Sequence, residues 1–132
     1  MRNKIVYLID DDKLSVKLVS LLIAKNESCE EIHPFFNARS ALDELQKNCD
    51  NNSKLPDIIL LDLNMPVMDG WQFLDEFALL PIKKEINIFI VTSSIDPADI
   101  EMAKIYNTLK GYIMKPITAE KLKFMARKEK IE

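Results

Sequence analysis

Short apolar runs alternate regularly with longer amphipathic stretches along this sequence, and this alternation limits the folds that are open to it. Four of the apolar runs, at residues 5–9, 58–61, 88–91 and 111–114, are each followed directly by a reactive polar residue. The segments between them place apolar residues at helical spacing and are bounded by residue types typical of helix ends. Such alternation predicts an α/β fold, with a parallel sheet covered by helices on both faces.

The pattern predicts five strands and five helices in strict alternation. Strands are expected near residues 4–9, 31–35, 57–61, 87–91 and 111–114, and helices near residues 13–25, 38–49, 69–80, 97–106 and 118–128. Three helices follow a residue suited to capping a helix N-terminus, namely Asn37, Asp69 and Asp96. In the first helix we expect the buried face to be a row of leucines at helical spacing: Leu14, Leu18, Leu21 and Leu22.

Length and composition predict a single domain covering residues 1–132, with a core that needs no disulfides or metals for stability. The net charge of −3 argues against a nucleic-acid-binding surface, which requires a strongly basic face. The apolar runs are too short for a membrane span. The two cysteines form no metal-binding motif, so we expect free thiols and a cytoplasmic protein that interacts with neither membranes nor nucleic acids.

Reactive side chains follow four of the predicted strands. Asp10 and Asp11 follow the first strand, Asp62 the third, Thr92 the fourth and Lys115 the fifth. In an open parallel sheet these strand ends lie at one edge, where ligands bind. Carboxylate oxygens are the ligands that Mg²⁺ prefers, and Mn²⁺ suits the same oxygens. Since a carboxylate can also act as a nucleophile towards phosphorus, this edge is expected to bind a divalent cation and a phosphoryl group.

At these residues the chain resembles the receiver domain of two-component response regulators. Four segments carry the resemblance: LIDDD at 8–12, DIILLDLNMPVMDG at 57–70, IVTSS at 90–94 and GYIMKP at 111–116. Each segment alone is a weak signal, whereas all four in this order are highly specific, and together they span nearly the whole chain. The resemblance implies a flavodoxin-like (βα)5 fold with the sheet order 2-1-3-4-5.

The resemblance also implies a role for each site residue. Asp62 would be the phosphoacceptor. Asp10, Asp11 and Asp62 would hold Mg²⁺ together with the backbone carbonyl of Asn64. Asp12, which follows Asp10 and Asp11, is expected to cap the first helix or to support the site from its edge.

Two further residues would contact the phosphoryl group, and one would respond to it. Thr92 and Lys115 would bind the phosphoryl oxygens, and Tyr112 would change rotamer with the Thr92 hydroxyl. The bond between Lys115 and Pro116 is expected to be cis, as is common in the family.

The resemblance further implies partners. The phosphoryl group would come from a histidine kinase or a phosphotransfer protein. The signal would pass to a separate effector protein through the face formed by the fourth helix, fifth strand and fifth helix. The chain would phosphorylate and dephosphorylate itself, but it would not be a turnover enzyme.

Two alternatives remain open from the sequence. A phosphorylation-independent adaptor would keep the fold without the chemistry, although the intact acidic residues and Lys115 speak against it. A Mg²⁺-dependent phosphatase with an aspartate nucleophile is less favoured, because such enzymes need a second acid two residues beyond the nucleophile. Asn64 occupies that position here.

Overall fold

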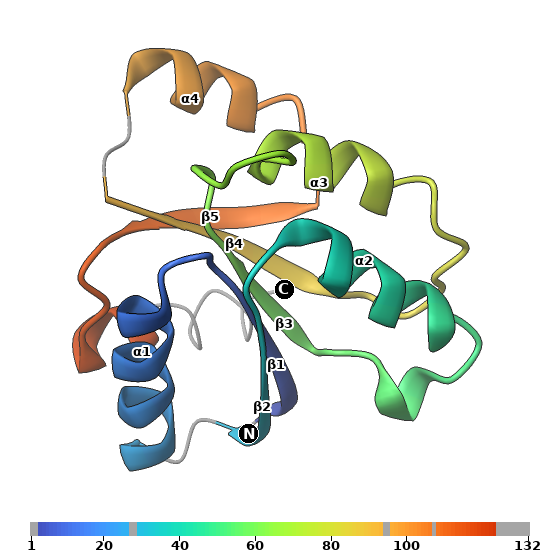
Figure 1. The fold of residues 1–132 in the computed structure, drawn as a ribbon, viewed down its shortest axis with the longest axis horizontal. Coiled ribbons are helices and arrows are strands. Elements are labelled where there is room, and N and C mark those ends of the chain that lie inside the picture. Colours follow the sequence, from blue (N-terminus) through green and yellow to red (C-terminus); the bar gives the residue numbers. More distant parts are fainter. Residues whose placement is uncertain (1–2, 27–28, 94–95, 107, 124–132) are drawn as a thin grey trace.

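The computed structural model describes residues 3–26, 29–93, 96–106 and 108–123. Within them, five parallel strands form one sheet in the order β2-β1-β3-β4-β5, which confirms the predicted topology (Figure 1). The strands are β1 (Asn3–Ile9), β2 (Cys29–Phe35), β3 (Ile58–Leu61), β4 (Asn87–Thr92) and β5 (Leu109–Met114). The helices are α1 (Lys13–Lys25), α2 (Ala38–Lys47), α3 (Gly70–Phe77) and α4 (Pro97–Ala103), with a 3₁₀ turn η1 at Asn52–Lys54.

The first turns of the helices follow the capping residues read from the sequence. Asn37 accepts a hydrogen bond from Ser40 N at the start of α2, and Asp69 forms a reciprocal capping box with Gln72 at the start of α3. Asp12, which was not predicted to be a metal ligand, caps α1 by accepting a hydrogen bond from Leu14 N. These bonds satisfy backbone N–H groups that have no partner within the helix.

Residues 119–123 are helical, and Lys121 N donates to the Thr118 hydroxyl, as expected for a cap. The rest of the predicted fifth helix, residues 124–128, lies outside the described residues. None of the helices described is long and apolar enough to cross a membrane.

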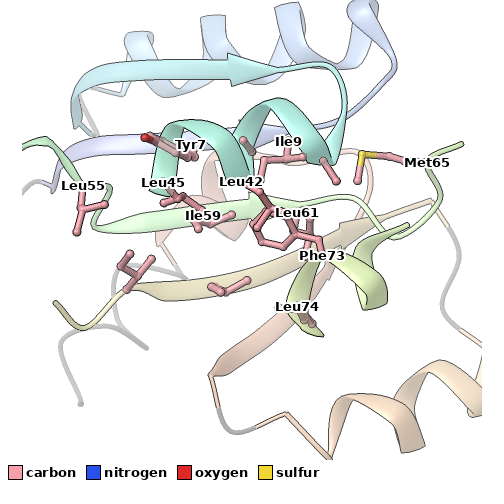
Figure 2. Packing of buried hydrophobic residues seen from close by; sticks show 14 of the residues in the cluster. Tyr7, Ile9, Leu42, Leu45, Leu55, Ile59, Leu61, Met65, Phe73 and Leu74 are labelled. Atoms are coloured by element: carbon pink, nitrogen blue, oxygen red, sulfur yellow. The ribbon is translucent and has the colours of Figure 1, made fainter. Parts of the chain in front are cut away.

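Two apolar clusters cover the two faces of the sheet. One joins alternate residues of the central strands to α2 and α3 and includes Tyr7, Leu42, Ile59 and Phe73 (Figure 2). The other joins the intervening strand residues to α1 and the segment that follows β5. Because β3 and β4 are covered on both faces, all of their residues are buried, as expected for central parallel strands.

The predicted buried face of α1 is wrong. Leu14, Leu18 and Leu21 are 65%, 58% and 59% exposed, and only Leu22 packs partly against the core. The buried residues are instead Val16, Val19 and Ile23, on the opposite side of the helix. Both sets have helical spacing, so the sequence pattern did not distinguish them; the compact β-branched side chains face the sheet, and the longer leucines face solvent.

Candidate functional site

The site lies where the carboxyl ends of β1, β3, β4 and β5 meet. Asp10 N donates to Phe35 O at the end of β2, and Asp62 N donates to Ile9 O at the end of β1. These bonds extend the parallel pairing of the strands by one residue, so the two aspartates follow the sheet edge closely. Both side chains are buried, whereas that of Asp11 is exposed.

The three carboxylates form a cluster able to hold a metal ion. Asp10, Asp11 and Asp62 each offer an oxygen, and these oxygens lie within 4.8 Å of one another. Opposite oxygens on one Mg²⁺ are separated by about 4.2 Å, twice the usual metal–oxygen distance. The donor set therefore fits a hard divalent cation after small side-chain adjustments. The backbone carbonyl of Asn64 stays a prediction as the fourth ligand.

Lys115 provides positive charge inside this cluster. Its Nζ lies 2.6 Å from Asp10 Oδ2 and 3.5 Å from Asp62 Oδ2. The Lys115–Pro116 peptide bond is cis, as predicted, and Lys115 N donates to Thr92 O. Burial lowers the pKa of Lys115, but the hydrogen bond and charge of Asp10, together with Asp62, outweigh it and leave this pKa raised. Lys115 therefore stays cationic at neutral pH.

The surroundings of the Asp62 carboxyl disfavour its ionised form. Burial and the neighbouring Asp10 charge raise its pKa to about 6, although Lys115 and the Asn64 backbone N–H act to lower it. Asn64 N donates to Asp62 Oδ1 at 3.2 Å. The carboxylates of Asp10, Asp11 and Asp62 outnumber the Lys115 ammonium by two charges. A divalent cation would neutralise this remaining negative charge.

The structure adds one contact that the sequence did not indicate. The side-chain amide of Asn64 donates to the Thr92 hydroxyl at 3.3 Å, although the two residues are 28 positions apart. Thr92 is fully buried at the end of β4. This bond holds the hydroxyl next to the site through the Asn64 side chain, for which the sequence predicted no such contact. No sequence spacing that involves Asn64 or Thr92 predicts this contact.

Tyr112 lies on β5, is 38% exposed, and pairs in register with Ile90 on β4. Met114, not Tyr112, is the register partner of Thr92. The predicted coupling between Thr92 and Tyr112 remains a prediction.

The close approach of α3 to the site requires a glycine. A Cβ at Gly70 would lie 2.9 Å from the Leu63 Cα and 3.0 Å from the Asp62 carbonyl oxygen. Gly70 N donates to Leu63 O at 3.0 Å. Without a side chain, the first turn of α3 therefore packs directly on the backbone that carries Asp62.

Comparison with known proteins agrees with this arrangement. Residues 6–127 match the family model described as the response regulator receiver domain. The chain is 31% identical over 98 residues to response regulator Rcp1 of Synechocystis sp., covering 74% of this chain and 67% of that protein.

Two solved structures share the fold over nearly their whole length. One is a two-component response regulator from Cytophaga hutchinsonii, with a TM-score of 0.88, 30% identity and full coverage of both chains. The other is a response regulator receiver protein from Dyadobacter fermentans, with a TM-score of 0.82, 25% identity and coverage of 96% of this chain and 98% of that one. The site geometry, the family match and these relatives lead to one conclusion: the chain belongs to the response regulator receiver domain family of two-component signalling.

Proposed function

We propose that this chain accepts a phosphoryl group on Asp62 from a histidine kinase or a phosphotransfer protein. The observation that carries the proposal is the buried Asp62 carboxylate, which lies at one edge of the sheet beside the ion pair of Asp10 with Lys115. An Asp62 oxygen would attack phosphorus and form an acyl phosphate. The P–N bond of a phosphohistidine would break, with its electron pair returning to the imidazole, which takes up a proton.

Each neighbouring group has a part in this transfer. Lys115 would turn from Asp10 towards the incoming phosphoryl oxygens, and the Thr92 hydroxyl would donate to another of them after leaving Asn64. Mg²⁺ held by Asp10, Asp11, Asp62 and the Asn64 carbonyl would neutralise charge on the phosphoryl oxygens. Mn²⁺ would serve in the same position.

Signalling would follow from the same rearrangement. Movement of the Thr92 hydroxyl would release space for the Tyr112 ring and reshape the face of α4, β5 and the helix after it. A separate cytoplasmic effector would read that face. The chain would act on its own aspartyl phosphate and not as a turnover enzyme.

The test is intact-mass spectrometry after incubation with Mg²⁺ and acetyl phosphate. Wild-type chain and Asp50→Asn, a matched change at an exposed aspartate, are expected to gain one labile phosphate, and Asp62→Asn none. Chelating the metal should abolish the adduct. Labelling of Asp62→Asn would refute the assignment. If the wild type neither gains an adduct nor binds Mg²⁺, the adaptor alternative is supported, whereas turnover of a phosphomonoester would support the phosphatase.

A further inference from the structure

The loop after the proposed phosphoacceptor contains a strained turn centred on Val67. Val67 has a φ of 70°, the only positive φ among the described residues. Met68 N donates to Pro66 O at 2.8 Å, which closes a three-residue ring around Val67. A positive φ with this hydrogen bond describes the classic γ-turn, a rare and strained conformation. A β-branched residue is especially unfavourable there, whereas glycine adopts a positive φ freely.

Nothing within the described structure offsets this strain through the Val67 side chain. Its exposure is 103%, so it buries no apolar surface against its own chain. The loop on either side is well anchored, however. Met65 is buried in the core, and Gly70 N bonds to Leu63 O. The chain therefore presents an apolar side chain to solvent on a rigid base, at a position where glycine would relieve the backbone.

The position of the Val67 side chain indicates which kind of molecule would contact it. The loop starts at the carboxyl end of β3, directly after Asp62, and returns to α3 at Gly70, which packs on the backbone of Asp62. A small phosphodonor reaches Asp62 without covering this loop. A protein that brings a phosphohistidine to Asp62 must cover the rim of the site, and it would remove an exposed rim side chain from water.

We propose that Val67 is a recognition residue for the protein phosphodonor, held in place by the strained turn. The inference rests on the proposed function, because it names the class of partner that reaches Asp62. Burial of a valine side chain on the donor favours the complex, so its loss is expected to weaken donor binding about tenfold. We expect this loss to raise KM for the protein donor, because Val67 touches neither the phosphoryl group nor its ligands.

The experiment compares two donors on a set of variants. The protein donor is a phosphorylated histidine phosphotransfer domain, chosen from a panel as the one that labels the wild type fastest, and the small donor is acetyl phosphate. Val67→Gly and Val67→Asn remove the apolar side chain and relieve the turn, whereas Val67→Ile keeps both the apolar character and the strain. Leu79→Asn is the matched control, since Leu79 is 78% exposed beyond the far end of α3.

The proposal predicts a change in the ratio of the two rates. Val67→Gly and Val67→Asn should show about tenfold lower kcat/KM with the protein donor, through KM, and acetyl phosphate rates within twofold of wild type. Val67→Ile and Leu79→Asn should match wild type with both donors. In urea titrations, Val67→Gly should unfold at a higher midpoint, which verifies that strain was removed.

Three results would overturn the proposal. Unchanged transfer from the protein donor to Val67→Asn would remove the recognition role and leave the proposed function intact. Equal slowing with both donors would show that the turn shapes the site and not the docking surface. A wild-type chain labelled by acetyl phosphate but by no donor of the panel would leave no partner for Val67 to recognise. By contrast, failure of acetyl phosphate to label the wild type would refute the proposed function itself.

Discussion

Two aspartates bracket the same four-residue strand, and their surroundings are opposite. Asp57, just before β3, lies 2.9 Å from Lys84 Nζ and accepts a hydrogen bond from Ile5 N. Lys84 also donates to Leu55 O and Asn52 O, so this amino end of the sheet is neutralised and hydrogen-bonded. Asp62, just after β3, shares one ammonium with Asp10, and its pKa is raised to about 6.

The difference is consistent with a stabilising role for the amino end of the strand and with the proposed phosphoryl chemistry at its carboxyl end. A carboxylate that meets one lysine and a backbone N–H ties three segments together at the amino end. Carboxylates that outnumber their cations store unfavourable charge at the carboxyl end. This excess negative charge could attract a metal ion and make Asp62 reactive. Its unfavourable energy is offset by stabilising contacts in the rest of the fold.

The change from Asp62 to Asn sharpens the contrast most. We expect complete loss of phosphoryl labelling together with a gain in stability at pH 7. Because the pKa of Asp62 is raised from 3.8 to about 6, the folded state binds its proton more tightly than the unfolded state. Ionisation of Asp62 therefore lowers stability as pH rises between about 4 and 6, by on the order of 3 kcal/mol once complete.

Urea titrations of wild type and Asp62→Asn at several pH values, without metal, measure this effect. The stability advantage of the variant should be small near pH 4 and reach its full size above pH 6. An advantage that is constant with pH, or that shrinks as pH rises, would contradict the charge explanation. Adding Mg²⁺ at pH 7 should stabilise the wild type more than the variant.

Replacement of Gly70 by Ala tests how tightly the reactive end is built. The added Cβ would meet the Leu63 backbone at 2.9 Å, so α3 or the loop must shift. We expect a loss of about 1–3 kcal/mol of unfolding free energy and weaker Mg²⁺ binding. Calorimetric titration with Mg²⁺ and urea unfolding measure the two effects, with Ala78→Gly beyond α3 as the control for a Gly/Ala exchange near a helix end. Unchanged Mg²⁺ affinity would show that the site does not depend on this contact.

The change from Asp57 to Asn should act in the opposite direction to the change at Asp62. It leaves Lys84 without its carboxylate partner, in a partly buried position. We expect a loss of about 1–2 kcal/mol of stability at pH 7, with labelling by acetyl phosphate unchanged. Chemical denaturation checks the sign, and Lys83→Met beside Lys84→Met separates the specific pair from a general effect of charge. If both aspartate variants shifted stability in the same direction, the comparison between the two strand ends would fail.

The smallest effect is expected on the outer face of α1. Leu18, 58% exposed, lines a groove of about 350 Å³ with Lys115 and Ile117 beside the reactive end. Leu18→Ala should change stability by less than about 0.5 kcal/mol. The neighbouring change Val19→Ala, at a buried position, should cost about 2 kcal/mol. Equal losses measured by denaturation would instead support the leucine face predicted from the sequence pattern.

The α1 helix shows where sequence reasoning fails. Its bounds are as predicted, yet its orientation is reversed, because apolar residues occur on both sides of the helix. The helix α2, by contrast, has a single apolar face, which carries the buried residues Ala41, Leu42 and Leu45. A hydrophobic pattern orients a helix only when the opposite face is polar.

The candidate site shows the same division. The residues Asp10, Asp11, Asp62 and Lys115 were identified by their place after apolar runs, because parallel strands bring such positions to one edge. The contact of Asn64 with Thr92, the preference of Lys115 for Asp10 and the γ-turn at Val67 were not predicted. Each depends on distances between atoms that neighbouring residues in the chain do not specify.

The order of the elements, the helix caps and the candidate site residues could be read from the sequence, because they follow from local periodicity and from residues adjacent in the chain. The buried face of α1 and the different charge environments of Asp57 and Asp62, at the two ends of one strand, depend instead on the three-dimensional packing of the chain. Burial and electrostatic fields act through space, so they are set by groups from distant segments. For that reason the same residue type serves as a structural anchor at one end of β3 and as the candidate phosphoacceptor at the other.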